Sequence, residues 1–193
     1  ADRFGGYVRT RSKLAVSIMA AGVQGSSISS YRTSIDSVTY SGSPFTTNTL
    51  NTAGNLTLTV TITDSRGRTA STTRTVTVLD YSPPSLSQFT AERCNADGTT
   101  AQTDGTKVRI SVKASGSSVG GKNTLACTVY YKLSSAESWV SAVTLTPSDY
   151  VITATNRLLS PTFDTLSSYD IKIRVQDVFY YIEQTVSIGT KQV

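Results

Sequence analysis

The chain has 193 residues, enough for one large domain or two small ones, and it carries 18 Lys and Arg against 13 Asp and Glu. The net charge of +5 is spread along the chain without a basic run, so we expect no nucleic-acid-binding groove. Histidine and long apolar runs are both absent from the sequence, which argues against His-dependent catalysis and against membrane insertion.

The residue types indicate strands rather than helices. Thr, Ser, Val and Tyr are abundant, and charged residues are few. β-branched and aromatic side chains fit a pleated surface that is half buried, and no segment shows sustained helical periodicity. We therefore expect an all-β protein.

The first half of the chain contains alternating apolar segments separated by turn residues. Its opening segment places Leu14, Val16 and Ile18 on one face of an extended chain. The pattern predicts strands over 12–20, 27–33, 37–41, 45–50, 55–63 and 68–79.

A boundary follows in the stretch "VLDYSPPSLS", residues 78–87. Proline has no backbone N–H and restricts the residue before it, so Pro83 and Pro84 cannot both lie in a central strand. We expect a short linker here and place the domains at residues 1–80 and 81–193.

The second half predicts seven short strands with frequent turn signals between them. They cover 86–93, 106–114, 124–132, 139–145, 150–155, 169–176 and 182–189. Short alternating strands at such spacing are typical of a sandwich of two antiparallel sheets. We therefore expect two tandem immunoglobulin-like β-sandwich domains, without the Cys and Trp spacing of antibody domains.

The two halves also resemble each other. The segment "KLAVSIMAAG" (13–22) matches "KVRISVKASG" (107–116), and "LTVTITD" (58–64) matches "IKIRVQD" (171–177). The apolar positions keep the same register in both matches. This similarity predicts that each half is one copy of the same unit, with a longer connection inside the second copy.

No set of residues indicates catalysis. Cys94 and Cys127 lack metal-ligand spacing, and we expect buried free thiols, although a bond between neighbouring strands stays open. The carboxylates are scattered, and a turn explains Asp80 better than a calcium site does. We predict no catalytic residues, no metal site, no cofactor and no enzymatic activity.

Two turns are candidate binding sites. One is Asp64–Arg68, where Arg66 and Arg68 flank a glycine, and the other contains Phe179, Tyr180 and Tyr181. Exposed Tyr and Phe side chains with an arginine nearby, here Arg174, are typical of interface cores. The alternative is that the aromatic residues cap the end of the sandwich or pack on the neighbouring domain.

The aspartate that begins each of these turns has a structural explanation. Asp64 and Asp177 can bond the backbone of their own turns, and Gly67 can adopt a positive φ. This geometry does not require the two arginines, so Arg66 and Arg68 stay open for a surface contact. We expect the second turn to be three residues shorter than the first.

An ordered set of short motifs resembles a family. It comprises the T-D-S-R-G-R hairpin (63–68), Y-S-P-P (81–84), R-C-N-x-D-G-T (93–99), D-G-x-x-V (104–108) and G-K-N (121–123). Together they resemble the tandem immunoglobulin-like region of a tailed-phage (siphophage) tail-associated structural protein family of unassigned function.

This resemblance implies a virion component of the phage tail or tail tip that acts as a spacer or a host-surface binder. Its expected partners are other tail proteins, further copies of the chain, or a host surface glycan. The alternatives are a repeat module of a bacterial cell-surface adhesin, which would be extracellular, and an accessory carbohydrate-binding domain of a secreted hydrolase. No catalytic residue comes with the resemblance.

Overall fold

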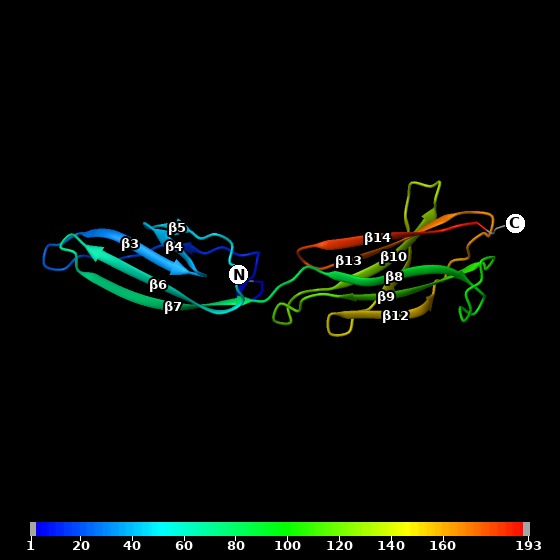
Figure 1. Cartoon of the computed structure of the whole chain (residues 1–193), viewed down its shortest axis with the longest axis horizontal. Helices are drawn as coiled ribbons and strands as arrows, with labels where there is room; N and C mark the ends of the chain where they lie inside the picture. The colour runs from blue at the N-terminus through cyan, green and yellow to red at the C-terminus, as the bar shows by residue number, and fades with distance from the viewer. Residues whose placement is uncertain (1–2, 191–193) are drawn as a thin grey trace. The chain divides into compact units, whose positions relative to one another are not determined.

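In the computed structural model, which describes residues 3–190, these residues form fourteen β-strands and no helix (Figure 1). The chain forms two compact units: residues up to Tyr81 together with 119–122, and residues 82–118 together with those from Asn123 onward. The predicted domains, 1–80 and 81–193, did not include the grouping of 119–122 with the first unit. The described residues contain no helix that is long and apolar enough to cross a membrane.

The first unit contains two sheets. Five strands lie in the order β1-β7-β6-β3-β4, and two strands, β2 and β5, form a small second sheet. All pairs are antiparallel except β1 and β7, which run parallel through Tyr7 and Val8. The bounds are β1 Tyr7–Val8, β2 Ala15–Val16, β3 Ile28–Ile35, β4 Val38–Ser41, β5 Phe45–Thr46, β6 Gly54–Asp64 and β7 Thr69–Leu79.

The core of the first unit follows the two-residue period of its strands. Leu58 and Val60 on β6 are buried, and the residues between them face outward or are partly exposed. The buried apolar cluster of this unit consists of Leu14, Ile35, Leu50, Leu58, Val60 and Val78.

Two predicted strands of the first unit are much shorter than expected. The segment 12–20 forms strand only at Ala15–Val16, and 45–50 only at Phe45–Thr46, and these two pieces pair with each other. A strand needs a hydrogen-bonded partner along its length. Neither segment has a second partner among the described strands, so the alternating pattern alone does not extend them. The pattern also did not indicate β1.

The second unit is a sandwich of a four-stranded and a three-stranded sheet. The strand orders are β11-β10-β13-β14 and β12-β9-β8, and every pair is antiparallel. The bounds are β8 Ser85–Cys94, β9 Lys107–Ser115, β10 Ala126–Leu133, β11 Val140–Leu145, β12 Val151–Leu158, β13 Tyr169–Gln176 and β14 Tyr181–Ile188. The expected all-β, immunoglobulin-like class is confirmed.

Strands β9, β10 and β13 fill the core of the second unit with alternating apolar side chains. Ile171, Ile173 and Val175 on β13 are fully buried, and the residues between them are partly exposed. Phe163 lies edge-on to Tyr131 and Tyr169, with ring centroids 5.4 and 5.1 Å away. Edge-on contacts of this kind suit the aromatic quadrupole.

The seven strands predicted for the second unit are all present, with ends that shift by a few residues. The largest difference is β12, which continues to Leu158 instead of ending at 155. Its register shifts between Ala154 and Arg157, and Asn156 adopts a φ of 49° there. The strand therefore continues through a bulge in which Asn156 adopts the left-handed conformation. The polar residues around this bulge are why the sequence predicted an earlier end. Pro83 and Pro84 lie outside any strand, as predicted.

Candidate functional site

The hairpin between β6 and β7 is closed by an aspartate. Asp64 Oδ1 accepts hydrogen bonds from the backbone N–H of Arg66 and of Arg68, each at 2.9 Å. The Asp64 N–H donates to the Arg68 carbonyl at 2.9 Å, and Gly67 adopts a φ of 78°. The predicted role of Asp64 in turn geometry is therefore what the structure shows.

The Asp64 carboxyl is held in its charged form. Burial raises its pKa, but hydrogen bonds from the backbone and side chain of Arg68 and from the backbone of Arg66 outweigh burial and lower the pKa to about 2. The Arg68 guanidinium contacts Asp64 Oδ2 through Nε at 2.8 Å and Nη2 at 2.7 Å. This is a charge-assisted, two-pronged contact.

The two arginines of this hairpin contact the loop that precedes β3. Arg66 Nη2 donates to the Gln24 carbonyl at 2.8 Å. Arg68 Nη2 donates to the Val23 carbonyl at 3.2 Å and to Ser26 Oγ at 3.1 Å. Both side chains therefore hold the loop that precedes β3 against the hairpin.

The hairpin between β13 and β14 uses the same aspartate chemistry. Asp177 Oδ1 accepts from the backbone N–H of Phe179 at 2.7 Å and of Tyr180 at 2.8 Å, and the Asp177 N–H donates to the Tyr180 carbonyl. The closing residue is Tyr180 here and Arg68 in the first hairpin, so the second turn is one residue shorter. The predicted difference of three residues is wrong.

Asn123 supports the second turn from a neighbouring loop. It is buried, and its Nδ2 donates to Asp177 Oδ2 at 3.3 Å and to the Ser117 carbonyl at 2.7 Å. Its Oδ1 accepts from the Val178 N–H at 3.3 Å. In the first hairpin an arginine fills the corresponding place beside the aspartate.

The aromatic residues after Asp177 differ in their exposure to solvent. Tyr180 and Tyr181 are each 51% exposed, and their rings stack with centroids 6.3 Å apart. Phe179 is only partly exposed. The Arg174 guanidinium lies 4.0 Å from the centre of the Tyr181 ring, a close cation–π contact.

More aromatic and cationic residues lie on the outer side of this four-stranded sheet. Lys172 Nζ lies 4.5 Å from the Trp139 ring centre and 5.5 Å from that of Tyr130. Lys172 and Arg174 occupy the positions of β13 that alternate with its buried residues. We call Tyr130, Trp139, Lys172, Arg174, Tyr180 and Tyr181 together the aromatic–cationic face.

Sequence reasoning found the tyrosine pair and the nearby Arg174, and it missed the other members of this face. The alternation of β10 and β13 contained the missing signal, because Tyr130, Lys172 and Arg174 all lie at positions between core residues. The alternation did not show that β10 and β13 are neighbouring strands. Their pairing is what brings the three side chains together.

Acidic side chains accompany the cations. Glu183 lies 3.5 Å from Lys172 and 3.7 Å from Arg174, measured from carboxylate oxygen to side-chain nitrogen. Within the described chain, Arg174 Nε is buried and has no hydrogen-bond acceptor. One donor of this guanidinium is therefore unsatisfied beside the exposed Tyr181 ring, which is an unfavourable arrangement unless something else accepts from it.

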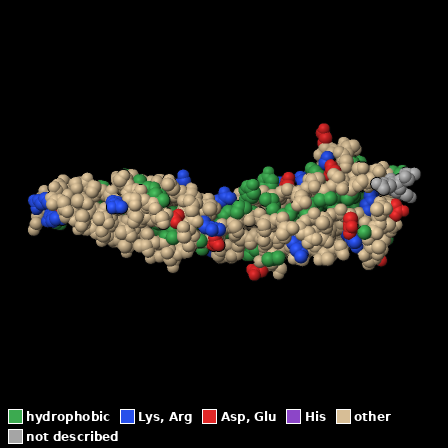
Figure 2. All heavy atoms as spheres, in the orientation of Figure 1, with side chains coloured by type: hydrophobic (Ala, Val, Ile, Leu, Met, Phe, Trp, Pro, Cys, Tyr) green, Lys and Arg blue, Asp and Glu red, His purple; other side chains and the backbone are tan. Residues whose placement is uncertain are grey.

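The surface of the protein is otherwise mainly polar and uncharged. On the face drawn in Figure 2, Lys and Arg side chains lie in separate small groups rather than in a continuous stripe. Among residues 3–190 no group of three or more His, Cys, Asp or Glu could hold a metal ion. Cys94 and Cys127 are buried free thiols, and burial raises the pKa of both, that of Cys127 to about 11.

Residues 5–193 match the family described as "Siphovirus protein of unknown function (DUF859)". The chain belongs to this family. The predicted resemblance to a siphophage protein family is thus confirmed, and membership favours a virion-associated phage structural protein. No curated protein matches the chain.

Two solved structures are similar to this siphovirus protein. One is a chimeric titin Z1Z2-Z1Z2 tandem functionalised with a GRGDS exogenous peptide from fibronectin, with 13% identity, 96% of this chain and 94% of that chain covered, and a TM-score of 0.36. The other is the FN1–FN3 domains of chicken CNTN1, with 11% identity, 97% and 66% covered, and a TM-score of 0.35.

The motifs that suggested the siphovirus family have structural roles in the second unit. Arg93 is 6% exposed, and its guanidinium donates to backbone carbonyls alone. The acceptors are the carbonyls of Gly105, Phe163, Asp164, Ser167 and Gly189, at 2.8 to 3.4 Å. One buried cation therefore holds together the β8–β9 loop, the β12–β13 loop and the end of β14.

The neighbouring motif residues shape turns. Asp97 Oδ1 accepts from the Thr99 N–H at 3.0 Å, and Asn95 Oδ1 accepts from the Thr100 N–H at 3.0 Å. A side chain at Gly105 would collide with the Cys94 carbonyl, since a Cβ there would lie 2.0 Å from that oxygen. These motif residues therefore have structural roles in the turns that they occupy.

Proposed function

We propose that this siphovirus protein is a non-enzymatic structural module of the phage tail or tail tip that binds a glycan on the host surface through the aromatic–cationic face. The observation that carries the proposal is the group of exposed and partly exposed rings and cations on the outer side of the four-stranded sheet. Arg174 stacks on Tyr181 at 4.0 Å and Lys172 on Trp139 at 4.5 Å.

This arrangement suits a sugar for physical reasons. The C–H faces of a pyranose pack on flat aromatic rings, and Tyr and Trp offer such rings together with a polar group at the edge. Lys172 and Arg174 supply side-chain N–H donors for the hydroxyl and anionic groups of a sugar. A cofactor has no part in this function.

Such a module also acts as a spacer in the proposal, with other tail proteins or further copies of the chain as its partners. Two β-sandwich units that follow each other in one chain are common in extended surface proteins, but architecture alone does not identify a ligand. The family match favours this reading over a bacterial adhesin or an accessory domain of a hydrolase.

A glycan array tests the binding function. The full chain is compared with Tyr181→Ala, Arg174→Ala and the control Arg157→Ala, whose side chain is exposed on β12 of the same unit. We expect a signal on host-type glycans that drops at least about tenfold, or about 1.4 kcal/mol, in the first two variants and is unchanged in the control. Absence of any signal, or equal signals from all four proteins, would contradict glycan binding.

Purified virions test the tail assignment separately. Proteomics of intact particles and of isolated tails should detect peptides of this chain in both. Detection only in infected cells, and not in particles, would overturn the structural role in the virion. The result of the glycan array would be unaffected.

A further inference from the structure

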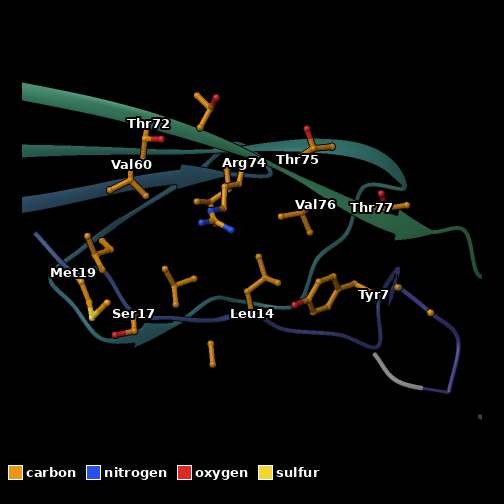
Figure 3. Close-up of a pocket in the computed structure, with 17 residues that line it drawn as sticks. Tyr7, Leu14, Ser17, Met19, Val60, Thr72, Arg74, Thr75, Val76 and Thr77 are labelled. Carbon is orange, nitrogen blue, oxygen red and sulfur yellow. The ribbon is translucent and has the colours of Figure 1, made fainter.

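The first unit contains an open groove between its two sheets. Its walls are the segment 14–19 on one side and residues 72–77 of β7 on the other, and its volume is about 680 Å³. Arg74 points into the groove from β7, while Leu14 and Met19 lie along the opposite wall (Figure 3). Tyr7 lies at one end.

In the second unit the corresponding place is filled by a strand. There β8 pairs with β9 along nearly its whole length, from Ser85 opposite Ser115 to Cys94 opposite Lys107, and it also lies against β14. The segment 13–22, which matches 107–116 in sequence, forms ladder pairs only with the two residues of β5. Beyond these pairs, Leu14 bonds to Thr47 and Ile18 bonds to Ser43. No described strand occupies its other edge.

The inner face of β7 is uncovered as a result. Val78 is buried, but Arg74, Thr72 and Ala70, which point to the same side of the strand, are exposed. Their cross-strand neighbours on β6, including the buried Val60 opposite Thr72, belong to the core face. A surface that faces the inside of a sandwich is therefore open to solvent.

The groove contains a charged residue, Arg74, where the second unit has an apolar one. Arg74 lies opposite Leu58, and the matching pair in the second unit is Val186 opposite Ile171. Val186 packs against the core of that unit. Within the described residues Arg74 makes no ion pair or hydrogen bond, and it is the only charged side chain that lines the groove.

We propose that this groove is an acceptor site for an extended strand of another polypeptide. The incoming strand pairs antiparallel with residues 13–21, as β8 does with β9, and lays alternate apolar side chains over β7. One of its inward side chains is a carboxylate that pairs with Arg74. This proposal is independent of the glycan-binding face, which lies in the other unit.

Three features favour a strand over a small ligand. The segment 13–21 has strand-type alternation but lacks a partner for its free edge, and such edges pair readily with an added chain. Met19, which lines the groove, is 97% exposed, so a bound strand would bury apolar surface there. An isolated arginine among apolar and Thr side chains favours an occupant with a negative charge at one position.

Binding of short peptides to the full chain tests the site. The probes are nine residues long, as β9 is, and alternate Thr with Val, with Glu replacing one Val at each inward position in turn. Matched peptides carry Lys instead of Glu. We expect one Glu peptide to bind, with its Lys counterpart at least about tenfold weaker.

A charge reversal in the protein makes the test specific. Arg74→Glu should weaken the Glu peptide about tenfold and strengthen the Lys peptide, whereas Arg32→Glu, an exposed change on the outer face of β3, should alter neither. Amide hydrogen exchange should show new protection at residues 15–19 when the Glu peptide is bound.

Several outcomes would overturn the proposal. They are failure of every peptide to bind, binding that is insensitive to Arg74→Glu, and protection outside residues 13–21. Concentration-dependent dimerisation that Arg74→Glu abolishes would also overturn it, because a second copy would then fill the groove.

Discussion

The matching segments 13–22 and 107–116 have the same apolar alternation and different structures. Lys107–Ser115 is a nine-residue strand with a partner on each edge, β8 and β12. Its counterpart forms two residues of strand and has a partner on one edge only. Alternation thus determines which side chains turn inward, while neighbouring strands decide whether the backbone forms a ladder.

The cores differ accordingly. Sixteen of the described residues form the buried apolar cluster of the second unit, and six form that of the first. Since buried apolar area is the main favourable contribution to folding, the first unit is expected to be the less stable of the two.

Matched core truncations should show this difference most strongly. Ile171→Ala removes a fully buried side chain and should destabilise the second unit by about 4 kcal/mol. Leu58→Ala, at the matching position beside the groove, should cost the first unit about 2 kcal/mol, because solvent already reaches that site. Hydrogen exchange of β13 and β6 amides measures each unit separately. Equal losses would contradict the idea that the first core is open.

The next largest effect is expected at Arg93, a buried cation that has no counterpart among the described residues of the first unit. Arg93→Met leaves five carbonyls without their donor and should destabilise the second unit by about 3 kcal/mol. Urea unfolding followed by fluorescence of Trp139, the single Trp of the chain, reports this unit. The exposed Arg157→Met should change stability by less than about 0.5 kcal/mol, and a similar effect of both variants would refute the role of Arg93.

The first hairpin should lose stability in acid. The pKa of Asp64 is lowered from 3.8 to about 2, so its contribution to stability is present above pH 3.8 and is lost as the pH falls toward 2. The Tm of the first unit should therefore drop over this interval in the wild type. The Asp64→Asn variant should have a lower Tm than the wild type at pH 7, and its Tm should change less with pH below pH 4. If the Tm of the variant falls in acid as steeply as that of the wild type, the Asp64 carboxyl is not the group responsible.

The smallest effect is expected from Arg74→Val, which places in the first unit the residue type of Val186. Because no strand covers the groove, the new side chain gains little burial, and stability should change by less than about 0.5 kcal/mol. Thermal unfolding monitored by circular dichroism measures this. A gain of about 1 kcal/mol or more would mean that the groove closes by itself.

The sequence by itself determined the all-β class, the exclusion of Pro83 and Pro84 from any strand, and the seven strands of the second unit. It also determined the turns at Asp64 and Asp177, because an aspartate bonds the backbone of its own turn. These features depend on local geometry and on the two-residue period, both of which can be read along the chain.

Only the tertiary structure decided the length of the segment around Ala15, the partners of Arg66 and Arg68, the role of Arg93 and the make-up of the aromatic–cationic face. Each depends on which distant segments become neighbours: β10 beside β13, or the Val23–Ser26 loop beside the first hairpin. Hydrogen bonds and ring contacts between distant segments leave no periodic pattern in the sequence. The sequence of one chain therefore does not predict them.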